Sequence, residues 1–340
     1  MLKYLLDFFR DPVTGIPRKH TFIKIYNLLL NQLSRRVFKT TYAFGYPIHL
    51  TVEATNLCNL RCPMCGTGKN FSVRKKGKIS FYAFKKVIDE LGRYLYVVGP
   101  FNLGEPLLNE EIFDMIFYAQ KKNIATILST NGVLLTKDIA SKIIDSGLEE
   151  LFISIDAATK KTYDIMRPGG DFDVLIGNIK SLVQEKKKRR SKTPYIIAQM
   201  VVTKYNENEI GDFRKMADEL GVDRYLLSDF WEQYLGNSSA EEETVNFYPM
   251  QEKYRNLGNA DLLVKDTCRW AWSGSVINWD GAVVPCCYDY NETYIIGNVF
   301  EEGFKQVWNN LKYRALRREI KNGRKNITLC KKCPRAYRIT

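Results

Sequence analysis

Three cysteines, Cys58, Cys62 and Cys65, stand close together in the segment 53–68, "EATNLCNLRCPMCGTG". Their short spacings let one loop wrap three sulfur atoms around a small inorganic group. Three thiolates are one short of the number that closes a tetrahedral zinc site or an all-protein iron–sulfur site. An open coordination position is typical of a reactive metal centre, so we expect chemistry at this loop.

A second group of cysteines lies further along the chain, at Cys268, Cys286, Cys330 and Cys333. Four thiolates suffice for a fully protein-ligated [4Fe–4S] cluster. Zinc is the alternative for both groups, which would make the chain an interaction protein rather than an enzyme. Cys287 is left over beside Cys286, either as an alternative ligand or as a small buried hydrophobe.

The elements that must position these cysteines follow an alternating pattern from position 49 to about 230. Short β-branched or aromatic runs alternate with helical stretches, which is typical of a parallel sheet. The predicted strands are His49–Thr55, Tyr96–Phe101, Ala125–Thr130, Leu151–Asp156, Tyr195–Thr203 and Arg224–Ser228, and the predicted helices are Ser80–Leu91, Glu110–Lys122, Thr136–Ser146, Asp173–Arg189 and Glu207–Leu220. We therefore expect an α/β fold with a partial (β/α)₆ barrel, whose functional residues collect at the carboxyl ends of the strands.

Polar residues follow three of these strands, in "NLGEPL", "STNG" and "SID". With the cysteine loop after the first strand, they make the chain similar to the radical S-adenosylmethionine enzymes. The resemblance implies that Cys58, Cys62 and Cys65 hold three irons of a [4Fe–4S] cluster and that S-adenosylmethionine chelates the fourth. It also implies that Gly104 and Glu105 receive the amino group of this cofactor.

The same resemblance assigns roles to four further residues. Ser154 and Arg167 would bind the carboxylate of S-adenosylmethionine, which suits the planar, two-donor guanidinium of arginine. Asn131 and Asp156 would lie close to the cofactor or the substrate. The alternative interpretation is a plain turn at Asn131 and a satisfied strand end at Ser154.

After about position 261 the alternation of strands and helices gives way to another sequence pattern. Asp280 and Gly281 predict a tight turn between two apolar strands in "SGSVINWDGAVVPCC", and a basic amphipathic helix follows. With its four cysteines this segment resembles the shortened twitch form of the SPASM extension, which binds one auxiliary [4Fe–4S] cluster. In such families a cysteine can also donate a hydrogen atom to a substrate radical, which is a catalytic role open to Cys287.

We expect the chain to consist of three parts. A helical extension (1–45) precedes the barrel (46–260), and a small C-terminal domain (261–340) follows it. An apolar stripe runs at helical spacing through Phe22, Tyr26, Leu29, Leu33 and Val37. The helix either caps the main domain or, as a basic amphipathic helix supported by Leu2, Leu5, Leu6 and Phe9, makes a peripheral membrane contact.

Charge and composition limit the partners and the cellular compartment that we expect for the protein. The 340 residues carry a formal net charge of +13, so anionic partners must be considered, although no separate RNA-binding module is visible and nucleic acid is not expected. The opening "MLKYLLDFFRDP" lacks the pattern of a cleavable signal, and no apolar run approaches the roughly 20 residues that cross a bilayer. We expect a cytoplasmic protein whose clustered cysteines are reduced and bind metal.

The predicted function is that of a radical S-adenosylmethionine oxidoreductase. Because an auxiliary cluster can accept the electron of a substrate radical, we expect oxidation of an alcohol carbon on a small polar molecule, such as a sugar or aminocyclitol. An electron donor such as flavodoxin or ferredoxin would be a partner. The alternatives are a radical epimerase, a peptide-maturation enzyme and an RNA-modifying enzyme.

Overall fold

The architecture is described from a computed structural model, which places residues 21–69, 73–230, 247–255, 268–330 and 333. A nine-stranded sheet runs through it in the order β6-β5-β4-β3-β2-β1-β7-β8-β9. The strands are β1 (His49–Val52), β2 (Val97–Gly99), β3 (Ala125–Thr130), β4 (Glu150–Ser154), β5 (Tyr195–Val202), β6 (Arg224–Asp229), β7 (Gly274–Ile277), β8 (Ala282–Val284) and β9 (Gly297–Asn298). Strands β1 to β6 pair in parallel with their sequence neighbours, as predicted for a partial barrel.

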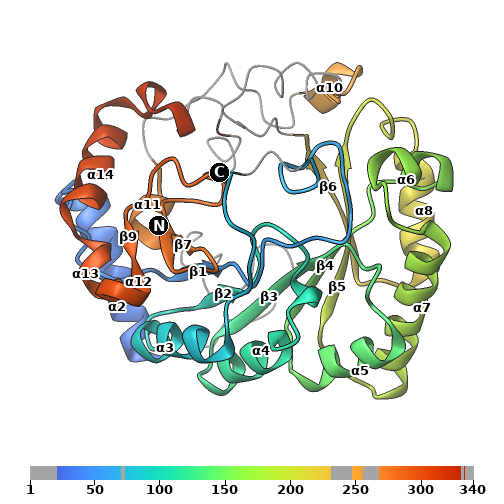
Figure 1. The fold of residues 1–340 in the computed structure, drawn as a ribbon, viewed down its shortest axis with the longest axis horizontal. Coiled ribbons are helices and arrows are strands. Elements are labelled where there is room, and N and C mark those ends of the chain that lie inside the picture. Colours follow the sequence, from blue (N-terminus) through green and yellow to red (C-terminus); the bar gives the residue numbers. More distant parts are fainter. Residues whose placement is uncertain (1–20, 70–72, 231–246, 256–267, 331–332, 334–340) are drawn as a thin grey trace.

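Helices cover the outer side of these strands, as Figure 1 shows for α3, α4, α5 and α7. The helices between successive strands are α3 (Phe81–Leu91), α4 (Ile112–Lys121), α5 (Lys137–Asp145), α6 (Lys160–Met166), α7 (Phe172–Lys188) and α8 (Ile210–Leu220). Side-chain caps start several of them, because Ser80, Thr136 and Asp171 each accept a backbone N–H of the first turn. Helix α6 was not predicted; it is only seven residues long.

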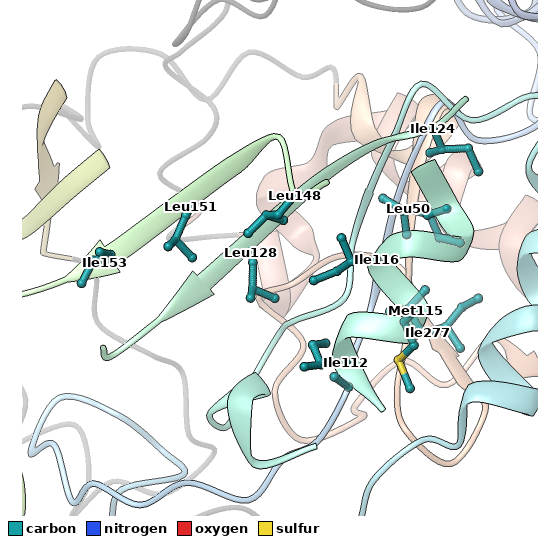
Figure 2. Packing of buried hydrophobic residues seen from close by; sticks show 14 of the residues in the cluster. Leu50, Ile112, Met115, Ile116, Ile124, Leu128, Leu148, Leu151, Ile153 and Ile277 are labelled. Atoms are coloured by element: carbon teal, nitrogen blue, oxygen red, sulfur yellow. The ribbon is translucent and has the colours of Figure 1, made fainter. Parts of the chain in front are cut away.

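The core lies between the sheet and these helices. Figure 2 shows Ile112, Met115 and Ile116 of α4 beside Leu50 and Leu128 of the strands, and all five side chains are fully buried. Helix α4 therefore presents an i, i+3, i+4 apolar face to the sheet. This packing fixes the strands whose carboxyl ends carry the site.

The C-terminal part joins the same sheet. Strand β7 pairs in parallel with β1, with His49 opposite Gly274 and Val52 opposite Ile277. The Asp280–Gly281 turn forms as predicted, with Gly281 at φ +88° and β8 antiparallel to β7. The remaining helices here are α10 (Glu252–Arg255), α11 (Trp270–Ser273), α12 (Val299–Glu302), α13 (Phe304–Trp308) and α14 (Leu311–Gly323), with short helical turns η2 (Pro106–Leu108), η3 (Arg324–Asn326) and η4 (Thr328–Cys330).

The N-terminal helix α2 (Phe22–Gln32) continues into a π-helical turn, η1 (Leu33–Val37). Figure 1 shows α2 on the side of the molecule where α13 and α14 lie. The segment after it is held by the C-terminal part, since Trp308 donates its indole N–H to the Gly45 carbonyl (2.7 Å) and Asn309 bonds Ala43. Leu2, Leu5, Leu6 and Phe9, and with them part of the predicted extension, lie outside the described residues.

Candidate active site

The first cysteine loop leaves the carboxyl end of β1. Cys62 is buried, and Cys58 and Cys65 are half-buried. A backbone bond from the Cys65 N–H to the Cys62 carbonyl (3.1 Å) tightens the loop. Gly68 packs against it so closely that a Cβ there would lie 2.6 Å from the Cys62 nitrogen.

Burial and mutual proximity act together on these thiols. Burial, together with smaller contributions from negative charge on Glu105, Cys62 and Cys65, raises the pKa of the Cys58 thiol to about 11. Burial likewise raises the pKa of Cys62. The three thiols are therefore electrostatic neighbours in a low-dielectric place, where bound cationic metal would favour their thiolate forms.

Gly104 and Glu105 lie in the loop that follows β2, against the cysteine loop. Gly104 has φ +76°, and a Cβ there would lie 2.5 Å from the Leu57 carbonyl oxygen and 2.6 Å from that of Thr55. Only glycine fits this backbone without strain. The next N–H, of Glu105, donates to the same Leu57 carbonyl (2.7 Å), so the two loops are fixed to each other.

The Glu105 carboxylate is buried and holds three donors. It accepts hydrogen bonds from the Thr130 hydroxyl (2.8 Å), the Asn131 backbone N–H (2.8 Å) and the Leu107 N–H (3.1 Å). Burial raises the pKa of Glu105, and these donors oppose that rise. The carboxylate is thus positioned by β3, and Thr130, which sequence reasoning passed over, supplies the side-chain contact.

Asn131 and Ser154 occupy the ends of β3 and β4. The Asn131 amide donates to Asn59 Oδ1 (2.8 Å), and its oxygen accepts from the Val133 N–H (3.0 Å). Asn131 therefore ties β3 to the cysteine loop. The Ser154 side chain is half-buried and makes no hydrogen bond within the described part of the chain.

Asp156 and Arg167 form a buried ion pair beside Cys62. Asp156 has φ +61°, an uncommon conformation that aspartate tolerates better than most residues. Its Oδ1 accepts from the Val201 N–H (2.7 Å), and its Oδ2 lies 2.5 Å from Arg167 Nη2. Arg167 Nη1 points at Cys62 Sγ (3.6 Å), so this cation lies next to the first cysteine set.

Two buried polar atoms next to Cys62 lack a partner. Arg167 Nε and the Tyr163 hydroxyl make no hydrogen bond among the described residues. Burial raises the pKa of Tyr163 to about 12, which keeps its hydroxyl a neutral donor. Tyr163 was not predicted; its position four residues before Arg167 on the helical segment is the signal that places both on one face.

The second cysteine set converges from three segments. Cys268 precedes α11, Cys286 follows β8, and Cys330 and Cys333 lie at and after η4. Burial raises the pKa of Cys286 well above its ordinary value, and charge on Cys268 and Cys333 adds to this. Burial raises the pKa of Cys330 to about 12, with Cys268 and Cys333 again as neighbours.

Neither set is arranged around a single ion. Within the described ranges, no three His, Cys, Asp or Glu side chains are grouped to hold one metal ion. A cubane cluster does not require such a grouping, because each thiolate binds a different iron.

Tyr290 connects the two cysteine sets. Burial raises the pKa of its hydroxyl, and nearby charge on Cys287, Cys65 and Cys286 raises it further. Cys65 belongs to the first set, whereas Cys286 belongs to the second. Tyr290 therefore lies close to residues of both sets, and Cys287, the sequence neighbour of Cys286, is also near it.

A buried triad also joins the two parts of the chain. Arg74, which follows the cysteine loop, donates two hydrogen bonds to the Glu53 carboxylate (3.0 and 2.6 Å). Its Nε lies 2.6 Å from Glu292 Oε1. Glu292 in turn accepts from the Asn278 amide (2.9 Å). Glu53 comes just after β1, so the triad links the barrel, the cysteine loop and the C-terminal part.

Comparison with protein families gives two matches to this chain. Residues 52–217 match the radical SAM superfamily, and residues 268–334 match SPASM, an iron–sulfur cluster-binding domain. The chain belongs to the radical SAM superfamily. Both the family predicted from the cysteine motifs and its C-terminal SPASM domain are confirmed.

Curated relatives extend over most of this radical SAM protein. It is 26% identical over 303 residues to the tungsten-containing aldehyde ferredoxin oxidoreductase cofactor-modifying protein of Pyrococcus furiosus, covering 81% of this chain and 84% of that one. It is 26% identical to mycofactocin maturase MftC of Mycobacterium ulcerans, covering 83% and 80%.

Solved structures confirm the fold. Streptococcus suis SuiB bound to its precursor peptide SuiA matches 98% of this chain and 80% of that chain, with a TM-score of 0.63 and 16% sequence identity. BtrN in complex with AdoMet and 2-DOIA matches 85% and 93%, with a TM-score of 0.51 and 16% identity. The α/β partial barrel is thus the fold of this radical SAM protein.

The residues present fit the cofactors of the family, [4Fe–4S] clusters and S-adenosylmethionine. Three neighbouring thiols suit a cluster with one open iron, and four suit a closed one. The unpartnered Arg167 Nε and Tyr163 hydroxyl beside Cys62 offer donors to an anionic group such as a carboxylate. No helix of the described segments has the length and apolarity of a membrane span.

Proposed function

We propose that this radical SAM protein catalyses an oxidative reaction on a substrate bound between its two cysteine sets. The observation that carries the proposal is the position of Tyr290, which lies close enough to both Cys65 and Cys286 for charge on either thiol to raise its pKa. A substrate in that region could lose a hydrogen atom on the side of the first set and an electron to the second. Such an arrangement favours net oxidation over a redox-neutral rearrangement.

The first set would supply the hydrogen abstraction. When bound, the cluster and S-adenosylmethionine supply reductive one-electron chemistry that yields a 5′-deoxyadenosyl radical. Gly104 and Glu105 would receive the amino group of the cofactor, because the buried Glu105 carboxylate is fixed by three donors. Ser154 and Arg167 would hold its carboxylate, and the free Nε of Arg167 supports this assignment.

The second set would complete the oxidation. Cys268, Cys286, Cys330 and Cys333 would hold an auxiliary cluster, which would supply an electron acceptor. The substrate would then lose a hydrogen atom to the adenosyl carbon, an electron to that acceptor and a proton to solvent or a side chain. An alcohol carbon would then become a carbonyl, and 5′-deoxyadenosine would be the co-product. We propose that Cys287 and Tyr290 line this substrate region, which also keeps Cys287 a candidate hydrogen-atom donor.

Two substrate classes are compatible with this chemistry. The first is the hydroxylated carbon of a small polar molecule, such as a sugar or aminocyclitol. The second is a peptide, which is favoured by the names of curated relatives: the mycofactocin maturases and the PqqA peptide cyclase of Bradyrhizobium diazoefficiens, 25% identical over 268 residues. Oxidation through the second set is common to both.

The proposal is tested with anaerobically reconstituted protein, reduced by flavodoxin or dithionite, and deuterated members of both substrate classes. We expect deuterium in 5′-deoxyadenosine and a product two electrons more oxidised than the substrate. Cys65→Ala should abolish 5′-deoxyadenosine formation, whereas Cys286→Ala should retain it and lose the oxidised product. An isomeric product that carries solvent deuterium, and whose formation Cys287→Ala abolishes, would instead establish an epimerase.

A further inference from the structure

The helical segment Phe22–Val37 packs against the rest of the molecule with its polar side. Lys24, Asn27, Asn31 and Ser34 are all buried. Lys24 donates to the Asn123 carbonyl (2.6 Å), and the amides of Asn27 and Asn31 donate to the Tyr46 carbonyl (3.0 and 2.8 Å). These bonds attach α2 to the barrel through specific polar contacts rather than through an apolar seam.

The apolar side of the same segment faces outward. The predicted stripe is exposed along its whole length, with exposed fractions of 84% for Phe22, 54% for Tyr26, 51% for Leu29, 38% for Leu33 and 64% for Val37. Further exposed apolar side chains widen it at Ile23, Ile25, Phe38, Tyr42 and Phe44. Single exposed apolar residues are ordinary, but a continuous aromatic and aliphatic face of this length marks an interaction surface.

The charge of the segment 21–52 has one sign. No Asp or Glu occurs between positions 21 and 52, whereas Arg35, Arg36 and Lys39 lie around the C-terminal end of the apolar stripe. Helix α14 adds one further cation at this end, since Lys321 donates to the Lys39 carbonyl, whereas the exposed Arg318 and Glu319 of the same helix carry opposite charges. The apolar face is thus bordered by cations at its C-terminal end.

We infer that the exposed face of Phe22–Val37 binds the surface of an anionic lipid bilayer. Aromatic and aliphatic side chains on one side, with cations and no acids in the segment 21–52 itself, match the interfacial region of such a membrane. Helix α2 has 11 residues, well short of the roughly 20 that span a bilayer, so the segment would lie in the surface plane.

A second copy of the chain fits this face less well. An isologous dimer places the same patch on both partners, which would bring Arg35, Arg36 and Lys39 of one copy towards the same cations of the other. Like charges at close range oppose such pairing. The anionic headgroups of a bilayer instead complement the cations while its acyl boundary accepts the apolar stripe.

The test is co-sedimentation of the full, cluster-loaded protein with vesicles of phosphatidylcholine alone or mixed with phosphatidylserine. We expect binding to the anionic vesicles that weakens as salt is raised. A Phe22→Ser/Leu29→Ser/Val37→Ser variant should bind more than about tenfold more weakly, because its apolar contacts are removed. An Arg36→Gln/Lys39→Gln variant should bind roughly 25-fold more weakly, about fivefold for each cation.

A matched control removes exposed apolar groups elsewhere, at Tyr82, Phe117 and Val174, which are 67%, 49% and 47% exposed. The Tyr82→Ser/Phe117→Ser/Val174→Ser variant should bind vesicles like the unaltered protein. All variants should still form 5′-deoxyadenosine, since none of these residues lies in the active site. Absence of vesicle binding, or equal binding by the stripe variant, would overturn the inference. So would a dimer in solution that only the stripe variant dissociates.

Discussion

The buried Glu53–Arg74–Glu292 triad gives the sharpest test of how the two parts of the protein depend on each other. The side chains of Arg74 and Glu53 are 3% and 0% exposed, so Arg74→Met leaves a carboxylate in the interior without its cation. Breaking such a pair from one side costs about 3–5 kcal/mol of unfolding free energy. For a chain of this size we expect the midpoint of thermal unfolding to fall by about 5–10 °C.

The effect of Arg74→Met should depend on pH. Burial raises the pKa of Glu53, and Arg74 opposes that rise, so the pKa climbs further in the variant. A carboxyl whose folded pKa exceeds its unfolded pKa takes up a proton on folding, and its stability contribution is lost as pH rises. Urea unfolding should therefore show a smaller loss of stability at pH 5 than at pH 8.

Two comparisons make this reasoning refutable. Glu292 is 15% exposed, and Glu292→Gln leaves the Arg74–Glu53 pair intact. This substitution should therefore lower the free energy of unfolding by only about 1 kcal/mol. The double variant Arg74→Met/Glu53→Leu should recover much of the loss, because no unpaired charge remains buried. If Arg74→Met costs no more than Glu292→Gln, the buried pair is not what stabilises this junction.

Three further predictions concern the clusters, the glycine at β2 and one surface carboxylate. Cys65→Ala and Cys286→Ala should each reduce the iron content from about eight to about four per chain, measured after anaerobic reconstitution; loss of all iron from either one would contradict two independent sites. Gly104→Ala should abolish 5′-deoxyadenosine formation while the Cys286 site keeps its iron, because the added methyl meets carbonyl oxygens of the cysteine loop at 2.5–2.6 Å. Hydrogen bonds from Lys85, Tyr118 and Lys122 lower the pKa of Asp89 to about 2. Asp89→Asn should therefore lower the free energy of unfolding above about pH 4, and this difference from the unaltered protein should vanish as pH falls towards 2. If urea unfolding gives the same difference at both ends of this pH range, the pKa of Asp89 is not lowered.

The strands of the barrel and the hairpin turn could be predicted from the sequence, because such elements depend mainly on residues close together in the chain. The period of the apolar positions located every strand of the barrel to within a few residues, and Asp280–Gly281 located the hairpin turn. The cysteine loop was singled out because its short spacings suit one small inorganic group, whereas Glu105 was assigned by resemblance to the radical S-adenosylmethionine enzymes, and its role stays a prediction.

The parts that sequence reasoning missed arise from long-range contacts. Arg74 meets partners 21 and 218 positions away, and no local signal links them. Thr130 was passed over for its neighbour Asn131, because spacing alone does not tell which side chain points at Glu105. The apolar stripe of α2 was found, but its outward direction depends on the polar bonds of Lys24, Asn27 and Asn31, which only the folded arrangement reveals.

The parallel pairing of β7 with β1 has a consequence for how the two cysteine-bearing parts are held relative to each other. The ladder joins the strand that leads into the first cysteine loop to the hairpin that carries Cys286. Their separation is then set by backbone hydrogen bonds within one sheet, and not by the docking of two hinged bodies. A chain shortened before β7 would expose the edge of β1 as an aggregation-prone strand. A change in the spacing of β1 and the β7–β8 hairpin would therefore require a change in the sheet itself, whereas side-chain substitutions would alter only the surroundings of each cysteine set.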